Sequence, residues 1–388
     1  MSSPTRHKRK SLTNPSADNL ETTSSSSPWP SSRSSSPANR AMMKRRLRET
    51  ASQGWPSSTS QLLNDSVFVA IKADDVYRQI GEIKSPKELF EKAKGWIATI
   101  RDMSFTEDKQ DIITAEIYEV VIRAIFGSNQ IERAGLNLEL TVLFCRKIFS
   151  AEEVGNISEG DSTCHNALLE LYHKQAELKD MPKKYVFRAR NEVVQHARAF
   201  QHIIHAFVVE KQHLSEDLIK QTHRILVKGV PIVEEGEEDV GPEKYGGVYR
   251  TVVVGAGTTN FTVPQFVPRK MEEMCAALKE ELIEAENKGT IDPFSVASKY
   301  SLEFVQIHPF QDGNGRMCRM ILNAILCRYA GVIVPIGEES EERTVYMGIK
   351  RRASQEMEGH GEYASFVLGK ACPRLREMKK KLTGKRGK

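Results

Sequence analysis

The segment His308–Arg319, with the sequence HPFQDGNGRMCR, combines residue types that suit chemistry on a phosphate group. Gly313 and Gly315 stand where a backbone must turn tightly or approach a ligand closely. A helix that begins at this turn presents its first amides and its dipole as an anion site. Arg316 and Arg319 are three residues apart and therefore project from one face of that helix. Two guanidinium groups of this kind suit a polyphosphate better than a single carboxylate.

Two further residues of the segment supply a metal ligand and a base. Asp312 is a hard oxygen ligand at the predicted phosphate site, as Mg²⁺ requires. His308 lies across the turn from the phosphates, where a general base can serve an incoming hydroxyl. Together these groups predict phosphoryl or nucleotidyl transfer. The sequence contains no G-x-x-x-x-G-K-[ST] phosphate loop, so this segment is the predicted nucleotide site.

Two helices are expected to position the segment. Asp292-Pro293 is a typical helix start, with Asp as the cap and Pro in the first turn, and the apolar periodicity continues to His308. The second helix is predicted from about Asn314 to Ala330 and ends at Gly331.

The rest of the chain is also mainly helical by pattern. From about residue 61, apolar residues recur at helical spacing, first around Val76 and Tyr77 and then over 89–100. Further helices are predicted at 111–150, at 191–209 and, with Ser215 as cap, at 214–227. The β-branched run 247–254, a glycine-rich turn and a short stretch ending at Pro264 predict a β-hairpin. The expected fold is mainly α with one small hairpin.

The two ends of the chain differ in charge from the part between them. Residues 1–60 and 374–388 each carry a net charge of +7, whereas the whole chain carries +5, so residues 61–373 are acidic. An acidic body argues against a core that binds nucleic acid with a broad basic face. The Ser- and Pro-rich residues 1–60 are predicted to be disordered, and their basic clusters fit either a nuclear-import signal or a solvated tail.

The remaining composition predicts an intracellular protein, cytoplasmic or nuclear, that is neither secreted nor bound to a membrane. No apolar stretch approaches the roughly 18 residues of a membrane helix, and the N-terminal residues lack the apolar block of a signal peptide. The six cysteines form no C-x-x-C pair and are expected to be buried thiols.

The segment His308–Arg319 resembles, position for position, the H-x-F-x-[DE]-G-N-G-R-x-x-R signature of Fic proteins. The resemblance implies a Fic-type helical bundle, flanked here by disordered tails. It also implies a protein adenylyltransferase, a nucleotidyltransferase that uses Mg²⁺ and transfers AMP from ATP to a Ser, Thr or Tyr hydroxyl of a target protein. By this resemblance His308 deprotonates the hydroxyl and Asp312 holds Mg²⁺ against the α- and β-phosphates.

The resemblance also assigns roles to the other residues of the segment. Asn314 is expected to contact the phosphates, and the amides around Gly313 and Gly315 to form the anion hole. Arg316 and Arg319 would hold the β- and γ-phosphates, while Phe310 packs the loop into the core.

Outside the segment, the hairpin at 247–264 resembles the family's flap, which positions a target segment by backbone pairing. Val253, Val254 and Gly255 are expected to touch the nucleotide, and Tyr346 resembles an aromatic residue that contacts the adenine. Self-modification and a homodimer are further implications. The predicted domains are a tail at 1–60, a helical region at 61–185 with a candidate inhibitory helix at 112–135, a Fic core at 186–372 and a basic tail at 373–388.

Many Fic proteins are inhibited by a helix with the pattern [ST]-x-x-x-E-[GN], whose glutamate pairs with the second arginine of the signature. The chain offers two candidates, Ser128–Glu132 upstream of the core and Ser354–Glu358 downstream. Glu132 is preferred because it lies on an apolar helix upstream of the core, although Arg133 occupies the Gly/Asn position.

Three alternatives remain open at this stage. The first is the reverse reaction, since related enzymes remove AMP. The second is another donor: a nucleotide such as UTP or GTP, or ATP used as in a kinase. A catalytically silent binding protein of the same fold is the third alternative, although it predicts degraded catalytic positions, and all of them are intact here.

Overall fold

The computed structural model describes residues 69–79, 85–103, 107–155, 164–233, 238–255, 261–355 and 359–384. These residues form helices and a single short sheet. The α-helices are α3 (Pro86–Asp102), α4 (Glu107–Ile131), α5 (Leu138–Phe149), α6 (Cys164–Lys174), α7 (Lys183–Ile204), α8 (Glu216–Leu226), α9 (Pro242–Tyr245), α10 (Val267–Lys288), α11 (Pro293–Ile307), α12 (Asn314–Ala330), α13 (Ser340–Gln355) and α14 (Gly361–Leu382). Shorter elements are the 3₁₀ turns η1 (Ala176–Asp180) and η3 (Pro264–Phe266), the π-helical turn η2 (His205–Val209), and the strands β1 (Ala70–Ile71) and β2 (Thr290–Ile291).

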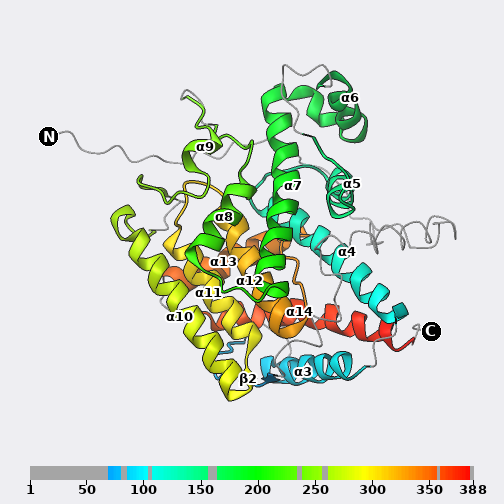
Figure 1. Cartoon of the computed structure of the whole chain (residues 1–388), viewed down its shortest axis with the longest axis vertical. Helices are drawn as coiled ribbons and strands as arrows, with labels where there is room; N and C mark the ends of the chain where they lie inside the picture. The colour runs from blue at the N-terminus through cyan, green and yellow to red at the C-terminus, as the bar shows by residue number, and fades with distance from the viewer. Residues whose placement is uncertain are drawn as a thin grey trace.

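Helix α12 lies in the middle of the bundle (Figure 1). Helices α4, α7 and α11 all pack against it, and nearly all of its side chains are buried. The buried set includes Arg316, Arg319 and Asn323, which are each at most 3% exposed. Buried charges are costly unless they are paired, so a helix that carries two of them at the centre of the fold indicates a functional site.

The helix ends around the site follow their predicted capping residues. The Asp292 carboxylate accepts hydrogen bonds from the backbone N–H groups of Phe294 and Ser295 at the start of α11. Ser215 caps α8 through a hydrogen bond from the Leu218 amide, and α12 ends at Gly331 with a φ of 64°. The structure confirms these predictions. They could be made from the sequence because each cap depends on an interaction between residues close together in the chain.

The prediction of helix around Val76 and Tyr77 is wrong. Residues 72–79 form no helix, and β1 before them pairs in parallel with β2, with Ala70 opposite Thr290 and Ile71 opposite Ile291. The Tyr77 hydroxyl and the Asp74 amide both donate to the Asp292 carboxylate, at 2.8 and 2.9 Å. These long-range contacts hold the segment, which turns at Asp75 and Val76, against the start of α11 and outweigh its helical periodicity.

We expect Asp292→Ala to lower the free energy of unfolding by about 2–4 kcal/mol, since it removes a helix cap and leaves the Tyr77 hydroxyl and the Asp74 amide without their acceptor. Asp292→Asn keeps one oxygen acceptor and should lose roughly half as much. Urea denaturation measures both, with the exposed Asp239→Ala as a neutral control. A midpoint unchanged from the parent in Asp292→Ala would contradict this reading of the contacts.

The predicted hairpin at 247–264 is not a β-ladder in the residues described. Residues 247–255 and 261–263 contain no strand, and residues 256–260 lie outside the described part. The two arms are joined instead by the guanidinium of Arg250, which donates to the carbonyl oxygens of Val252 and Thr262. The Arg250 amide donates to Pro309, so the first arm pairs with the turn after α11 rather than with the second arm.

The predicted domain boundaries are only partly comparable with the structure. Helix α14 continues to Leu382 and packs on α3 and α11, so the first residues of the predicted basic tail lie inside a helix. The domain boundaries themselves stay a prediction. Residues 1–60 and the predicted nuclear-import clusters lie outside the described residues. Every helix in the described part is too short or too polar to cross a membrane.

Candidate active site

The segment His308–Arg319 comprises the turn between α11 and α12 and the first residues of α12. Helix α11 ends at His308, whose backbone is left-handed with a φ of 52°, and α12 begins after Gly313, with a φ of 79°. Glycine adopts a left-handed backbone without strain, whereas a left-handed backbone is uncommon for a histidine. The left-handed backbone at His308 is therefore held by its surroundings, as is often seen at functional sites.

The imidazole of His308 has a defined tautomer and partner. Its Nδ1 lies 3.1 Å from the carbonyl oxygen of Val305, a contact that requires the hydrogen to be on Nδ1. The Nε2 atom therefore keeps its lone pair. Burial lowers the pKa of His308 to about 3, so the ring is neutral near pH 7. The ring of Phe261 stacks on it with 3.8 Å between ring centres.

Asn314 closes the loop between His308 and α12. Its Oδ1 accepts from the Phe310 amide at 2.9 Å, and its Nδ2 donates to the Phe310 carbonyl at 2.7 Å. The expected packing of Phe310 into the core is confirmed, because the ring is fully buried against Phe304 and Tyr249. Asn314 thus braces the loop here, while its expected contact with phosphates stays a prediction.

Arg316 lies at the start of α12, and only some of its N–H donors have an acceptor among the described residues. Its Nη2 donates to Asp312 Oδ2 at 3.3 Å, whereas Nε and Nη1 are buried without an acceptor among the described residues. A buried guanidinium with unused donors beside the first amides of a helix is a site that an anion would complete. The geometry therefore fits the expected phosphate contact.

Asp312 is the carboxylate that could hold a metal ion at this site. Among the described residues no group of three or more His, Cys, Asp or Glu side chains is placed to bind a metal. A lone carboxylate is nevertheless typical of Mg²⁺ sites, in which substrate phosphates and water complete the coordination shell. Asp312 is therefore suited to Mg²⁺ that is bound together with a nucleotide.

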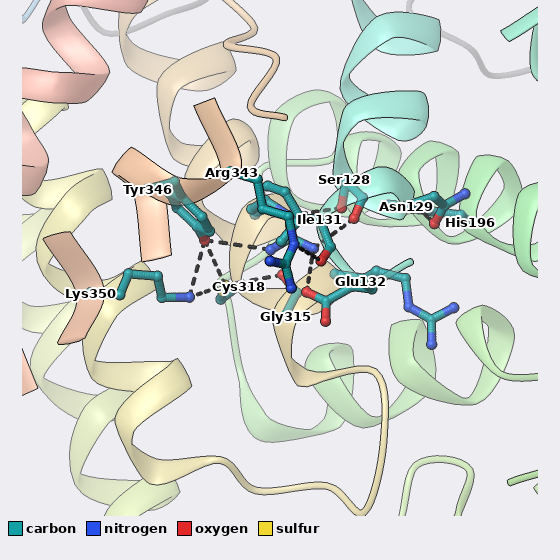
Figure 2. Close-up of polar contacts among 12 residues, drawn as sticks. Ser128, Asn129, Ile131, Glu132, His196, Gly315, Cys318, Arg343, Tyr346 and Lys350 are labelled. Carbon is teal, nitrogen blue, oxygen red and sulfur yellow. Dashed lines mark hydrogen bonds and ion pairs between the residues drawn. The ribbon is translucent and has the colours of Figure 1, made fainter. Parts of the chain in front are cut away.

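Ser128 on α4 and Glu132 just after it lie beside Gly315 of α12 (Figure 2), and both accept hydrogen bonds from Arg319. Its Nε donates to the Ser128 hydroxyl at 2.8 Å and its Nη2 to the Ser128 carbonyl at 2.9 Å. Nη2 also lies 2.7 Å from Glu132 Oε1. Burial alone would raise the pKa of Glu132, but the Arg319 guanidinium outweighs it and the pKa lies below its ordinary value. Glu132 is therefore ionised.

The Glu132 carboxylate occupies the predicted anion site itself. A Cβ atom built on Gly315 would lie only 1.9 Å from Glu132 Oε1, so the carboxylate rests directly on the first turn of α12. Only glycine permits this approach. The upstream candidate glutamate thus meets the second arginine of the segment, whereas Glu358 lies outside the described residues.

Arg133 stands where the inhibitory pattern has Gly or Asn, and its backbone shows why those residues are preferred there. It adopts a left-handed backbone with a φ of 53°, and Gly135 follows with a φ of 78°. Glycine and asparagine favour that region, so the pattern reflects the turn that ends α4. Arg133 adopts the same turn at some cost in strain.

Tyr346 lies at the arginine end of the site. Its hydroxyl is 3.5 Å from Arg319 Nη1 and accepts from Lys350 Nζ at 3.0 Å. The ring is fully buried against Tyr363 and Phe366, so it offers no open face to an adenine base. In the flap, by contrast, Val253 is 66% exposed, Val254 is partly buried and Gly255 is exposed.

Residues 213–326 match the model of the Fic/DOC family. The matched stretch, residues 213–326, is a Fic domain. The chain is 29% identical over 158 residues to protein adenylyltransferase fic-1 of Caenorhabditis elegans, a match that covers 40% of this chain and 28% of that relative. It is 35% identical over 97 residues to a Fido domain-containing protein of Dictyostelium discoideum, covering 25% of this chain and 65% of the relative. The chain thus spans less than two thirds of the length of these relatives.

Solved structures show the same fold at low identity. Fic-1 of C. elegans (residues 134–508) has a TM-score of 0.56 and 16% identity, covering 90% of this chain and 87% of that structure. A Fic domain-containing signaling protein of Bacteroides thetaiotaomicron has a TM-score of 0.54 and 19% identity, covering 78% and 99%. The predicted helical Fic fold is therefore confirmed.

The structure adds residues to the Fic site that the sequence analysis missed. Arg188 on α7 brings a second guanidinium to Asp312, in addition to that of Arg316, with Nη2 at 3.9 Å from Oδ2. Glu192, one turn further along, accepts from Arg188 Nε and from the Gly135 amide, and so connects Asp312, through Arg188, to the turn after α4. The sequence shows that Arg188 and Glu192 are four residues apart and can therefore pair on one face of a helix. Only the packing of α7 on α4 and α12 shows what this pair contacts.

Arg250 is predicted to lie in a strand, yet in the structure it joins the predicted flap to the turn between α11 and α12. It is 5% exposed, and its Nε donates to the His308 carbonyl at 2.6 Å. The sequence feature that could have indicated this role is the charge of Arg250 within a β-branched run. It indicates a buried cation that needs several acceptors, and here backbone carbonyls supply them.

Proposed function

We propose that this Fic domain transfers AMP from ATP to a hydroxyl group of a target protein. Two groups carry the proposal. On one side of the loop is a neutral histidine with its lone pair on Nε2, and at the start of α12 is a buried arginine whose Nε and Nη1 have no acceptor among the described residues. One group suits proton abstraction and the other suits a polyphosphate, and the loop sets both at a fixed separation.

In the proposed reaction His308 Nε2 accepts the proton of the target hydroxyl. The hydroxyl oxygen forms a bond to the α-phosphorus, and the bond from that phosphorus to the oxygen of the β-phosphate breaks. Pyrophosphate leaves, and its charge is stabilised by Arg316 and, once it is free, Arg319. Mg²⁺ held by Asp312 would neutralise part of the phosphate charge.

We further propose that Glu132 inhibits the domain in the state described. Its carboxylate lies on Gly315 and binds Arg319, which are the groups expected to receive phosphates. A carboxylate and a phosphate oxygen compete for the same donors, so a nucleotide binds productively only when Glu132 moves away. The Glu132 side chain is 32% exposed, which leaves room for that movement.

Hydrolysis of an AMP–protein bond is a second candidate function. Glu132 is an ionised carboxylate next to the anion site, which is the group needed to align an attacking water molecule. In this reaction Glu132 would promote the activity, not inhibit it.

Mass spectrometry of the intact chain tests the proposal. We expect a chain with Glu132→Gly, incubated with ATP and Mg²⁺, to gain the mass of one AMP group on itself or on an added protein extract. Radiolabel placed on the α-phosphate should be retained and label on the γ-phosphate lost. Retention of γ-label would instead show a kinase, and preferential labelling from UTP or GTP would contradict ATP as the donor. Removal of Mg²⁺ by EDTA should abolish the adduct.

A further inference from the structure

His223 on α8 joins the flap to the catalytic loop. It is fully buried, and both ring nitrogens are used. Its Nδ1 accepts a hydrogen bond from the Gly247 amide at 2.9 Å, so Nδ1 carries no hydrogen. Its Nε2 therefore carries the hydrogen and donates it to the Asp312 carbonyl at 2.9 Å. Neutral imidazole in one tautomer satisfies both contacts at once.

The catalytic loop rests on the His223 ring. The ring stacks on Phe310 with 3.7 Å between centres and 3° between planes. A Cβ atom on Gly313 would lie 3.1 Å from His223 Nε2, so the left-handed turn before α12 is packed closely on the same ring. The imidazole thus contacts three residues of the segment that places Asp312 and the first amides of α12.

The flap side of His223 is equally defined. Gly247 has a φ of 72°, and it precedes Arg250 at the point where the flap leaves α9. Three residues later, Arg250 binds the carbonyl oxygens of Pro309 and His308. The flap is therefore joined to the catalytic turn at two points, and His223 provides the first of them.

We infer that His223 is a positioning residue that holds the flap and the metal-ligand loop in register. This inference rests on the proposed function, since it assigns a purpose to a linkage between the target-binding and nucleotide-binding parts of one site. Loss of the Nε2 contact should disturb Asp312, whereas loss of the Nδ1 contact should disturb only the flap. A residue that merely fills the core would not separate these two effects.

Two substitutions separate the contacts. His223→Asn places an amide oxygen at the position of Nδ1, so it keeps an acceptor for Gly247 but has no donor for Asp312. His223→Gln places an amide N–H at the position of Nε2, so it keeps the donor for Asp312 but has no acceptor for Gly247. His223→Phe keeps the stacking on Phe310 and loses both hydrogen bonds. All three are made in the Glu132→Gly background, so that Glu132 does not occupy the nucleotide site.

Hydrogen exchange of two backbone amides reports each contact without any need for activity. The Gly247 amide binds His223, and the Phe310 amide binds Asn314 within the loop. We expect His223→Gln to speed exchange at Gly247 about tenfold or more and to leave Phe310 near the parent rate. His223→Asn should do the reverse, and His223→Phe should speed both. Equal changes at both amides in the Asn and Gln variants, or no change in either, would overturn the inference.

Binding of ATP with Mg²⁺, measured by calorimetry, adds the functional readout. We expect His223→Asn to raise the dissociation constant about tenfold and His223→Gln to leave it within about twofold of the parent. The reverse ranking would overturn the inference. If the parent itself binds no ATP, the proposed function fails, and the exchange rates alone then decide the role of His223.

Discussion

Replacing Glu132 by glycine is expected to raise AMP transfer by roughly 10- to 100-fold. Glu132 makes a charge-assisted contact with Arg319 at 2.7 Å and lies on the first turn of α12. Hydrogen bonds to charged groups are worth about 1.5–3 kcal/mol, and about 1.4 kcal/mol corresponds to a factor of ten. Removal of the carboxylate frees both groups for phosphate at the same time. The measurement is the initial rate of α-label incorporation at saturating ATP.

The fold should tolerate this change. Arg319 keeps its two contacts with Ser128, so its charge is not left without partners. Glu132 also lies after the last residue of α4, where glycine costs less than it does inside a helix. Thermal unfolding of the variant should therefore stay close to that of the parent.

Glu119→Gln is a matched control for the glutamate. Glu119 lies on α4, the helix that precedes Glu132, is 29% exposed and pairs with Arg146 at 2.8 Å, away from the segment His308–Arg319. We expect no change in rate from it, and an intermediate rise from Glu132→Gln, which keeps the length of the side chain but not its charge. A rate in Glu132→Gly that equals or falls below the parent rate would contradict inhibition. A fall would favour the hydrolytic function, which requires the carboxylate.

The parts of the site that were predictable from the sequence are those held by local interactions. The segment from His308 to Arg319 is continuous and runs from the end of α11 into the start of α12. The starts and ends of these two helices are marked by Asp292, Gly313 and Gly331. Its chemistry could be read because the residues that make the turn also carry the functional groups. The pairing of Glu132 with Arg319 could be proposed only from the resemblance to a family, since 187 residues separate them.

What could not be predicted depends on packing between distant helices. His223 appears in the sequence as one more histidine on an amphipathic helix, and its role needs Gly247 and Asp312 to meet it from two other segments. The flap was predicted as a hairpin because its residues are β-branched. Arg250 replaces the ladder with bonds to carbonyl groups of both arms and of the catalytic turn, an arrangement that no pattern of apolar residues indicates.

His308→Ala, made in the Glu132→Gly chain, is expected to reduce the rate of AMP transfer by roughly 10²- to 10⁴-fold. Its Nε2 is the free lone pair of a ring whose Nδ1 is committed to Val305. Binding of ATP should change little, because Arg316, Arg319 and the amides of α12 lie beyond the loop. The rate and the dissociation constant for ATP are measured on the same protein. A lower rate with unchanged ATP binding indicates loss of the base, whereas weaker ATP binding indicates damage to the nucleotide site.

The backbone at position 308 requires a second variant. Alanine is strained at a φ of 52°, so His308→Ala could also shift the turn, whereas asparagine tolerates this conformation. His308→Asn should therefore keep the loop and still lose the base. His205→Ala, which removes a more exposed histidine paired with Glu210, serves as the control and should keep the full rate. Undiminished transfer in both His308 variants would rule out the assigned base.

The lowered pKa of His308 gives the same prediction a pH dependence. An ordinary histidine is half protonated near pH 6.5, and a rate that needs the neutral ring would fall below that value. Burial lowers the pKa of His308 to about 3, so the neutral form persists as the pH falls from about 8 to about 5. We expect the ratio kcat/KM for ATP to stay nearly constant over that range in the Glu132→Gly chain. A tenfold fall centred near pH 6.5 would show that His308 is solvated in the working enzyme and that the stacking of Phe261 on its ring does not persist.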